Sequence, residues 1–400
     1  MILSMSYYQA LALDFVFSYA LLLMKNLLVI GIPFLYEHNL LLNILLLCFV
    51  FMVYSITFVI YRKLTLNRTC LVWLLGIFLF WLGTYACNAD LFHYSYVVEA
   101  LSHFIVYSIP ALFVLSQLKD LSFMFQLFIK LRWLFLVIAI VSIYFVLSNG
   151  GIQGSNRYAS YSMSFGRNLI LPAFLFLYKF FERINILDII GFLLCLLMIF
   201  LFGSRFPLLC IALYLMSKLW EQRYKKGIIF GCLLSLLMFF VLFVYWTEII
   251  AWLYDFLANT FNIRSRALQL LLDENFVNND SGRSLIWKEL IAQVNLSPIW
   301  GYGAGGGNVI LDNGLAHSFI LDVLANLGYV FGGVFLIYSG YLIIRTYYVN
   351  RFYHNNIEYI KMLLCLFLPI CMIQFGMWSA NYFWQLIALS CLHLKGENNV

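Results

Sequence analysis

The chain has 400 residues, of which 64% are apolar and only 10% are charged, and its mean hydropathy is +0.92. These values exclude a water-soluble fold, because such a chain would expose more apolar area than a soluble surface carries. The net charge of +6 does not indicate nucleic-acid binding, because the basic residues lie between apolar runs rather than on one polar surface. The composition predicts an all-α polytopic integral membrane protein that contacts membrane lipids.

Apolar runs of about 20 residues, the length that a helix needs to cross the hydrocarbon core, recur along the whole chain. They predict about twelve transmembrane helices. A short amphipathic helix is predicted for 121–132, lying along the membrane surface before its span begins. No internal repeat or soluble domain is evident, so residues 1–400 are predicted to form a single transmembrane domain. The predicted spans are 8–36 (with a break near Lys25), 39–61, 69–87, 97–118, 133–148, 168–182, 186–203, 206–220, 228–246, 317–344, 359–377 and 379–394.

The distribution of basic residues predicts the topology. Placing the loop that contains Arg62, Lys63 and Arg68 in the cytoplasm puts most other basic residues on the same side, as the positive-inside rule requires. Both termini are then cytoplasmic. The outer face has two long loops, 149–167 and 247–316, and the second lies between the ninth and tenth helices.

Arg205 lies in the turn LFGSRFPLL between two predicted spans. An arginine close to the hydrocarbon core needs a partner or water. One interpretation is a guanidinium that reaches outward to lipid phosphate. The other is a guanidinium turned inward to bind a substrate phosphate, whose geometry its planar fork matches.

Arg283 begins a predicted amphipathic helix, with Asp280 or Ser281 as its N-cap. The free N–H groups and the positive dipole end of a helix start act together with such a side chain in binding an anion. The following run SPIWGYGAGGG predicts a flexible loop. It is not a nucleotide-binding loop, because no GK[ST] follows the glycines.

His317 stands just before the predicted helix 317–344, after Asp312 and Asn313. An imidazole with an ordinary pKa near 6.5 accepts a proton at neutral pH, as a hydroxyl acting as nucleophile requires. The alternative is a structural hydrogen-bonding role.

Other motifs that would indicate a different chemistry are missing. The sequence has no DxD pair, no GxSxG and no HExxH, and its nine cysteines form no CxxC pair. We therefore expect no metal site, no cofactor and no disulfide framework. Arginines would then stabilise the charge that a divalent cation stabilises in other enzymes.

Taken in order, these motifs resemble the O-antigen polymerase and O-antigen ligase superfamily of bacterial envelope proteins. The resemblance covers roughly residues 156–333 and includes NRYASYSMSFGRN, the GSR turn at Arg205, the helix start at Arg283, the glycine turn, and His317 followed by Asn326-Leu327-Gly328. One departure is that the ligases commonly have His-Asn where this chain has His317-Ser318.

The resemblance implies that Arg205 and Arg283 bind the pyrophosphate of an undecaprenyl-pyrophosphate-linked glycan and that His317 activates the acceptor hydroxyl. It also implies that Arg157 and Arg167 are substrate contacts, and the outer-loop residues Arg266 and Lys288 are further candidates for this role. The implied enzyme is a metal-independent inverting glycosyltransferase with a GT-C-like fold. It would polymerise lipid-linked repeat units at the periplasmic face of the bacterial inner membrane, in lipopolysaccharide O-antigen synthesis.

Three alternatives stay open at this point. An O-antigen ligase would use the same donor and transfer the glycan to lipid A-core. A flippase for the same lipid-linked sugars would use polar groups at mid-bilayer, for which Asp14 and Lys25 are the best candidates. The outer loops could instead serve only to dock a chain-length regulator protein.

Overall fold

The computed structural model describes 5–31, 39–63, 67–118, 120–148, 163–202, 205–222, 246–261, 272, 283–373 and 376–391. All regular structure in these ranges is helical, and none of it is β-strand. Five helical stretches of the described residues are long and apolar enough to cross a membrane, namely 44–61, 68–87, 95–115, 122–141 and 319–350. The protein is an all-α polytopic membrane protein, as the composition predicts.

Contacts divide the chain into two compact units. The first unit contains 1–19, 39–127 and 280–400, and the second contains 20–38 and 128–279. The single transmembrane domain expected from the sequence stays a prediction. Helices α1 (Tyr7–Gly31) and α7 (Ser122–Ser148) contribute residues to both units.

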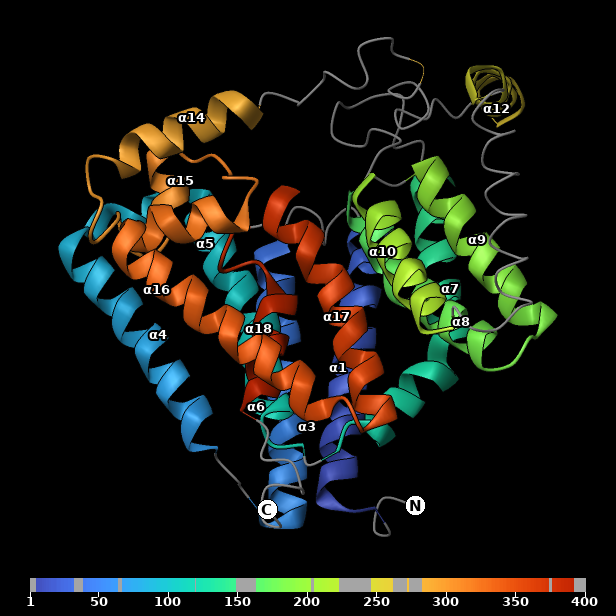
Figure 1. The fold of residues 1–400 in the computed structure, drawn as a ribbon, viewed down its shortest axis with the longest axis horizontal. Coiled ribbons are helices and arrows are strands. Elements are labelled where there is room, and N and C mark those ends of the chain that lie inside the picture. The colour runs from blue at the N-terminus through green and yellow to red at the C-terminus, as the bar shows by residue number, and fades with distance from the viewer. Residues whose placement is uncertain are drawn as a thin grey trace. The chain divides into compact units, whose positions relative to one another are not determined.

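The first unit is built around α18, whose side chains are buried on every face from Phe383 to Leu389. Helix α18 packs on α6, α16 and α17. Figure 1 shows α14 and α15 at the end of this unit where α16 begins. The helices of the unit are α3 (Asn39–Tyr61), α4 (Arg68–Cys87), η2 (Ala89–His93), α5 (Ser95–His103), η3 (Phe104–Ser108), α6 (Ile109–Leu115), α14 (Arg283–Val294), α15 (Gly306–Ile310), α16 (Phe319–Asn350), α17 (His354–Ile373) and α18 (Asn381–Ser390).

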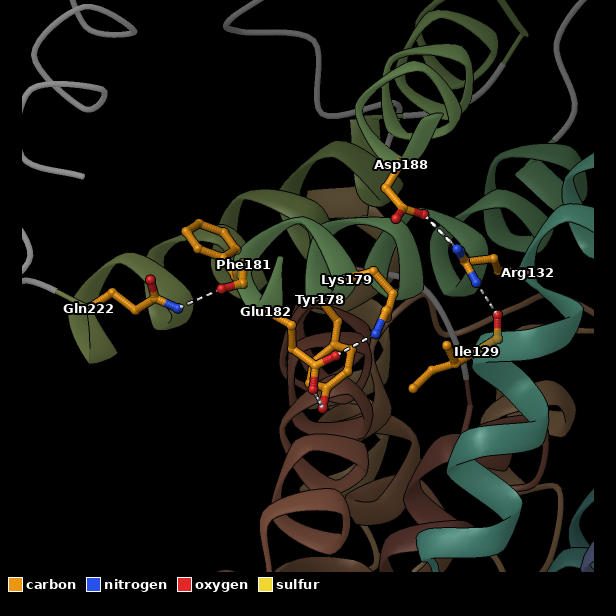
Figure 2. A network of polar contacts seen from close by, with 8 residues as sticks. All are labelled: Ile129, Arg132, Tyr178, Lys179, Phe181, Glu182, Asp188 and Gln222. Carbon is orange, nitrogen blue, oxygen red and sulfur yellow. Dashed lines mark hydrogen bonds and ion pairs between the residues drawn. The ribbon is translucent and has the colours of Figure 1, made fainter. Parts of the chain in front are cut away.

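The second unit contains α8 (Met163–Glu182), α9 (Ile186–Phe202), α10 (Arg205–Glu221) and α12 (Trp246–Phe261), and α8 packs on both α9 and α10. Figure 2 shows Arg132 on α7 pointing toward Asp188 in the first turn of α9. Two nitrogens of the Arg132 guanidinium lie 2.8 Å from Asp188 Oδ1, and a third donates to the carbonyl oxygen of Ile129 at 2.7 Å. This ion pair fastens α7 to α9.

Several predicted boundaries differ from the observed ones. Residues 122–148 form one continuous helix, so the separate surface helix predicted for 121–132 is wrong; Arg132 can lie within α7 because Asp188 neutralises its charge. Helix α1 continues past Lys25 without the expected break. Helix α18 has 10 residues, about 15 Å of rise, so it is too short to be the expected span over 379–394. The predicted span 228–246 lies almost wholly outside the described residues.

The expected outer loops contain helical structure where they are described. Helix α8 begins at Met163 and thus shortens the loop predicted for 149–167. The segment 247–316 includes most of α12 together with α14 and α15. The placement of both loops on the outer face stays a prediction.

Candidate active site

Helix α16 is kinked at Gly328, whose φ is 72° and ψ 178°. In a regular helix the N–H of Tyr329 would donate to the carbonyl oxygen of Ala325. It donates instead to the carbonyl oxygen of Pro298, at 2.7 Å. The Ala325 carbonyl, released in this way, accepts from the backbone N–H of Tyr302 at 2.8 Å. Residues 298–307, which we call the glycine-rich segment, therefore supply the hydrogen bonds that the kink removes from the helix.

Glycines make this close approach possible. Gly301, Gly303 and Gly305 all have positive φ, between 66° and 79°, in a region that other residues rarely adopt. A Cβ atom on Gly301 would lie 2.4 Å from the backbone nitrogen of Gly328. The run predicted to be a loop is held on α16 by specific backbone hydrogen bonds.

The side chain of Asn326 holds the same segment from within α16. Its Oδ1 accepts from the backbone N–H of Gly305 at 2.7 Å and from Nε1 of Trp378 at 3.0 Å. One turn earlier, Oδ2 of Asp322 accepts from the backbone N–H of Met377 at 2.6 Å. Both side chains are buried, and the sequence-based predictions assign Asp322 no role. A carboxylate one turn before an amide in an apolar helix is the signal that could have found this pair.

The segment that leads to His317 has a strained backbone. Asp312, Asn313 and His317 all have positive φ, at 45°, 69° and 49°, which costs about 1–3 kcal/mol for a residue other than glycine. Asn313 compensates part of this cost, since its Oδ1 accepts from the N–H of Tyr96 and its Nδ2 donates to Oγ of Ser95, both at 2.8 Å. These contacts fix the segment on the start of α5.

Ser318 fixes the other side of His317. It is the N-cap of α16, and its Oγ accepts from the N–H of Leu321 at 3.4 Å and donates to the carbonyl oxygen of Cys371 at 3.3 Å. Serine and asparagine are equally good N-cap residues. An asparagine at position 318 would therefore fill this N-cap position about as well as the serine does.

Helix α14 brings Arg283 to the same place. Its apolar residues Leu290 and Val294 pack on Ala316 and Ala325, and Trp287 donates from Nε1 to the carbonyl oxygen of Ala316 at 3.2 Å. Arg283 begins the helix one turn before Trp287. The segment before His317 is thus held directly against the first turns of α14.

Burial lowers the pKa of His317 below its usual value of 6.5, and the positive charge of Arg283 lowers this pKa further. Both side chains are half-buried. The structure therefore brings together two of the three residues predicted to be catalytic. The imidazole of His317, whose lowered pKa favours its neutral form, is within electrostatic range of the Arg283 guanidinium, which is able to hold an anion.

The other candidates are placed less closely. Arg205 is the first residue of α10, in the second unit, and its convergence with His317 stays a prediction. Lys288 is exposed on α14, and Arg167 is half-buried in the second turn of α8. Arg157 and Arg266, and the expected caps Asp280 and Ser281, lie outside the described residues. Where the chain is described, no three His, Cys, Asp or Glu side chains gather as a metal site requires, and metal independence stays a prediction.

Residues 190–337 match the model of the Wzy_C family, described as O-antigen ligase. The matched segment contains Arg205, Arg283, the glycine-rich segment, His317 and the kink at Gly328. No curated protein matches the chain, and no solved structure does. The match supports a relationship with the O-antigen ligase and polymerase superfamily.

Proposed function

We propose that this protein is an O-antigen polymerase, a GT-C-like glycosyltransferase of the bacterial inner membrane that joins undecaprenyl-pyrophosphate-linked repeat units at the periplasmic face. Both termini would be cytoplasmic. The observation that carries the proposal is the electrostatic interaction between His317 and Arg283, inside the segment that matches the O-antigen ligase family.

In the proposed reaction, His317 takes the proton from a sugar hydroxyl of one lipid-linked unit. The hydroxyl oxygen then forms a bond to the anomeric carbon of a second glycan, and the bond from this carbon to the pyrophosphate breaks with inversion. Arg283 and Arg205 stabilise the negative charge that develops on the leaving undecaprenyl pyrophosphate. The lowered pKa of His317 supports its role, because the imidazole is then neutral and able to act as a base at pH 7.

The remaining basic candidates would act on binding rather than on the chemical step. Arg157, Arg167, Arg266 and Lys288 would contact the phosphates or the glycan of the two substrates. A partner protein that regulates chain length would act on the product distribution without contributing to the site.

A second candidate is an O-antigen ligase, because the matching family model carries that description. A ligase would use the same donor and the same two charged residues, with lipid A-core as the acceptor. The structural equivalence of Ser318 and asparagine as N-caps removes one argument against this function. The two activities differ in the product that they form.

The test is a transfer assay with purified full-length protein and its cognate lipid-linked repeat unit, with and without EDTA, resolved as a glycan ladder. We expect a ladder that survives chelation and disappears in His317→Ala. The matched control is His93→Ala, because the side chain of His93 is 81% exposed in η2. Transfer only to added lipid A-core would replace the polymerase by the ligase, and a His317→Ala variant with full activity would overturn the catalytic assignment.

A further inference from the structure

A pocket of about 400 Å³ lies between α4 and α16 in the first unit. Helix α4 lines it along one face, since the lining residues follow the helical spacing of three and four. They extend over twelve residues, and the eleven steps between the first and the last rise about 16 Å along the helix axis. The pocket thus follows about half of the ~30 Å hydrocarbon core. The α4 residues are Thr69, Val72, Trp73, Gly76, Ile77 and Phe80.

The rest of the lining is aromatic and apolar. Helix α16 contributes Leu327, Phe335 and Tyr338, and the buried indoles of Trp378 and Trp384 also line the pocket. The ring of Trp73 lies 6.0 Å from that of Phe335 and 6.3 Å from that of Trp384, measured between centroids. These aromatic side chains present broad ring faces to an uncharged ligand.

The indole N–H groups of Trp378 and Trp384 are not available to a ligand in the pocket. Nε1 of Trp378 donates to Oδ1 of Asn326 at 3.0 Å, and Nε1 of Trp384 donates to the carbonyl oxygen of Met377 at 2.9 Å. Both donors are thus used within the protein. The remaining polar groups of the lining are the hydroxyls of Thr69 and Tyr338 and the indole N–H of Trp73. Because these are few in an otherwise apolar and aromatic lining, the pocket fits a hydrocarbon chain.

One end of the pocket lies next to the kink in α16, on which the glycine-rich segment is held. Leu327 lines the pocket and is followed directly by the kink residue Gly328. Thr84, one turn beyond Phe80 on α4, accepts from the backbone N–H of Ala304 in the glycine-rich segment at 2.9 Å. The glycine-rich segment is therefore hydrogen-bonded to both of the helices, α4 and α16, that line the pocket.

We propose that this pocket binds the isoprenoid chain of the lipid-linked substrate next to its pyrophosphate, an inference that rests on the proposed function. An acyl chain of a bulk phospholipid gains little by moving from the bilayer to an apolar pocket, because both surroundings are equally apolar. A chain whose pyrophosphate is held by Arg283 is kept at the pocket by its headgroup. The pocket then sets the depth and direction from which the donor enters the site.

Two glycines of α4 provide a matched pair of variants. Gly76 lines the pocket, whereas Gly83, two turns further along the same helix, does not. A Cβ atom at either position meets nothing within 4 Å. A tryptophan at position 76 fills the pocket, and a tryptophan at position 83 faces open space.

The experiment uses full-length protein in nanodiscs of phosphatidylethanolamine and phosphatidylglycerol, with photoreactive undecaprenyl pyrophosphate that carries no sugar as the probe. We expect cross-links in the peptide that contains residues 69–80, displaced by unlabelled undecaprenyl pyrophosphate. Gly76→Trp should weaken probe binding about tenfold, or about 1.4 kcal/mol, while Gly83→Trp binds as the unmodified protein does. Equal labelling by a photoreactive phospholipid, or undiminished binding in Gly76→Trp, would overturn the proposal.

Binding of the probe requires no glycan transfer, so the two proposals fail separately. If the protein binds the probe at residues 69–80 but makes no ladder, the pocket assignment stands and the proposed polymerase activity is wrong. If the Gly76→Trp and Gly83→Trp variants make a ladder equally well, the proposed polymerase activity stands and the pocket assignment is wrong.

Discussion

The indole nitrogen of Trp287 donates a hydrogen bond to the carbonyl oxygen of Ala316 at 3.2 Å. This contact joins the helix that begins at Arg283 to the residue that precedes His317. It is made within an apolar cluster in which Leu290 and Ala316 are almost fully buried. The position of Arg283 relative to His317 therefore depends on a tryptophan that does not itself carry charge.

Trp287→Phe should lower kcat while leaving the helix folded. The phenyl ring keeps most of the packing and loses the hydrogen bond, which costs about 1 kcal/mol of stability and loosens α14 over His317. Glu289→Gln, at an exposed position of the same helix, is the control and should keep its kcat. Transfer rates and thermal unfolding of the two variants test this, and equal kcat values would show that Trp287 does not position the site.

The rate of transfer should fall on the acid side with a midpoint below pH 6.5. Burial and the charge of Arg283 both lower the pKa of His317, so the imidazole becomes protonated, and inactive as a base, only below its ordinary pKa. Arg283→Met removes the second cause and should move the midpoint upward toward 6.5, although burial still holds it below that value. The measurement is a pH profile of kcat/KM on a single substrate.

Lys288→Met is the matched control for this profile, because it removes the same charge from an exposed position of α14. Its acid midpoint should stay where it is in the unmodified protein. A midpoint that shifts equally in both variants would indicate a general effect of net charge rather than an interaction between Arg283 and His317.

Gly301→Ala should destabilise the protein by about 2 kcal/mol or more, because alanine resists a positive φ and its Cβ would collide with the backbone of α16. Gly333→Ala, further along α16, is the control. A Cβ there meets nothing within 4 Å, so alanine should stabilise the helix by up to about 1 kcal/mol. Thermal unfolding in detergent measures both, and a Gly301→Ala variant of normal stability would contradict the observed packing of the glycine-rich segment.

Local sequence features predict the individual helices of this fold. They do not predict the contacts that join one helix to another. Apolar runs predict α3 and α4 almost to the residue, because spanning the hydrocarbon sets both their length and their composition. The continuity of α7 could not be predicted in this way. No local pattern shows that Asp188, a residue distant in sequence, pairs with Arg132 within this helix.

In the candidate site, too, the sequence reveals some of the residues but not the contacts between them. Arg283 and His317 stand out in the sequence because a charged residue and a histidine are rare in so apolar a chain. The contacts of Asn326 could not be predicted, because its partners Gly305 and Trp378 come from two different segments. The sequence of the glycine-rich segment predicts only a loop. Its hydrogen bonds go to a helix kink that no local sequence pattern reveals.

Asp188→Leu should destabilise the second unit strongly, because it leaves the charge of Arg132 without its partner in a mostly buried place. The side chains of Arg132 and Asp188 are 16% and 3% exposed, and breaking such a pair costs about 3–5 kcal/mol. The double variant Arg132→Met with Asp188→Leu should recover much of this loss, since it buries no unpaired charge. Thermal unfolding of the two single variants and the double variant forms a complete cycle. Losses that simply add in the double variant would show that the contact in Figure 2 does not hold α7 and α9 together.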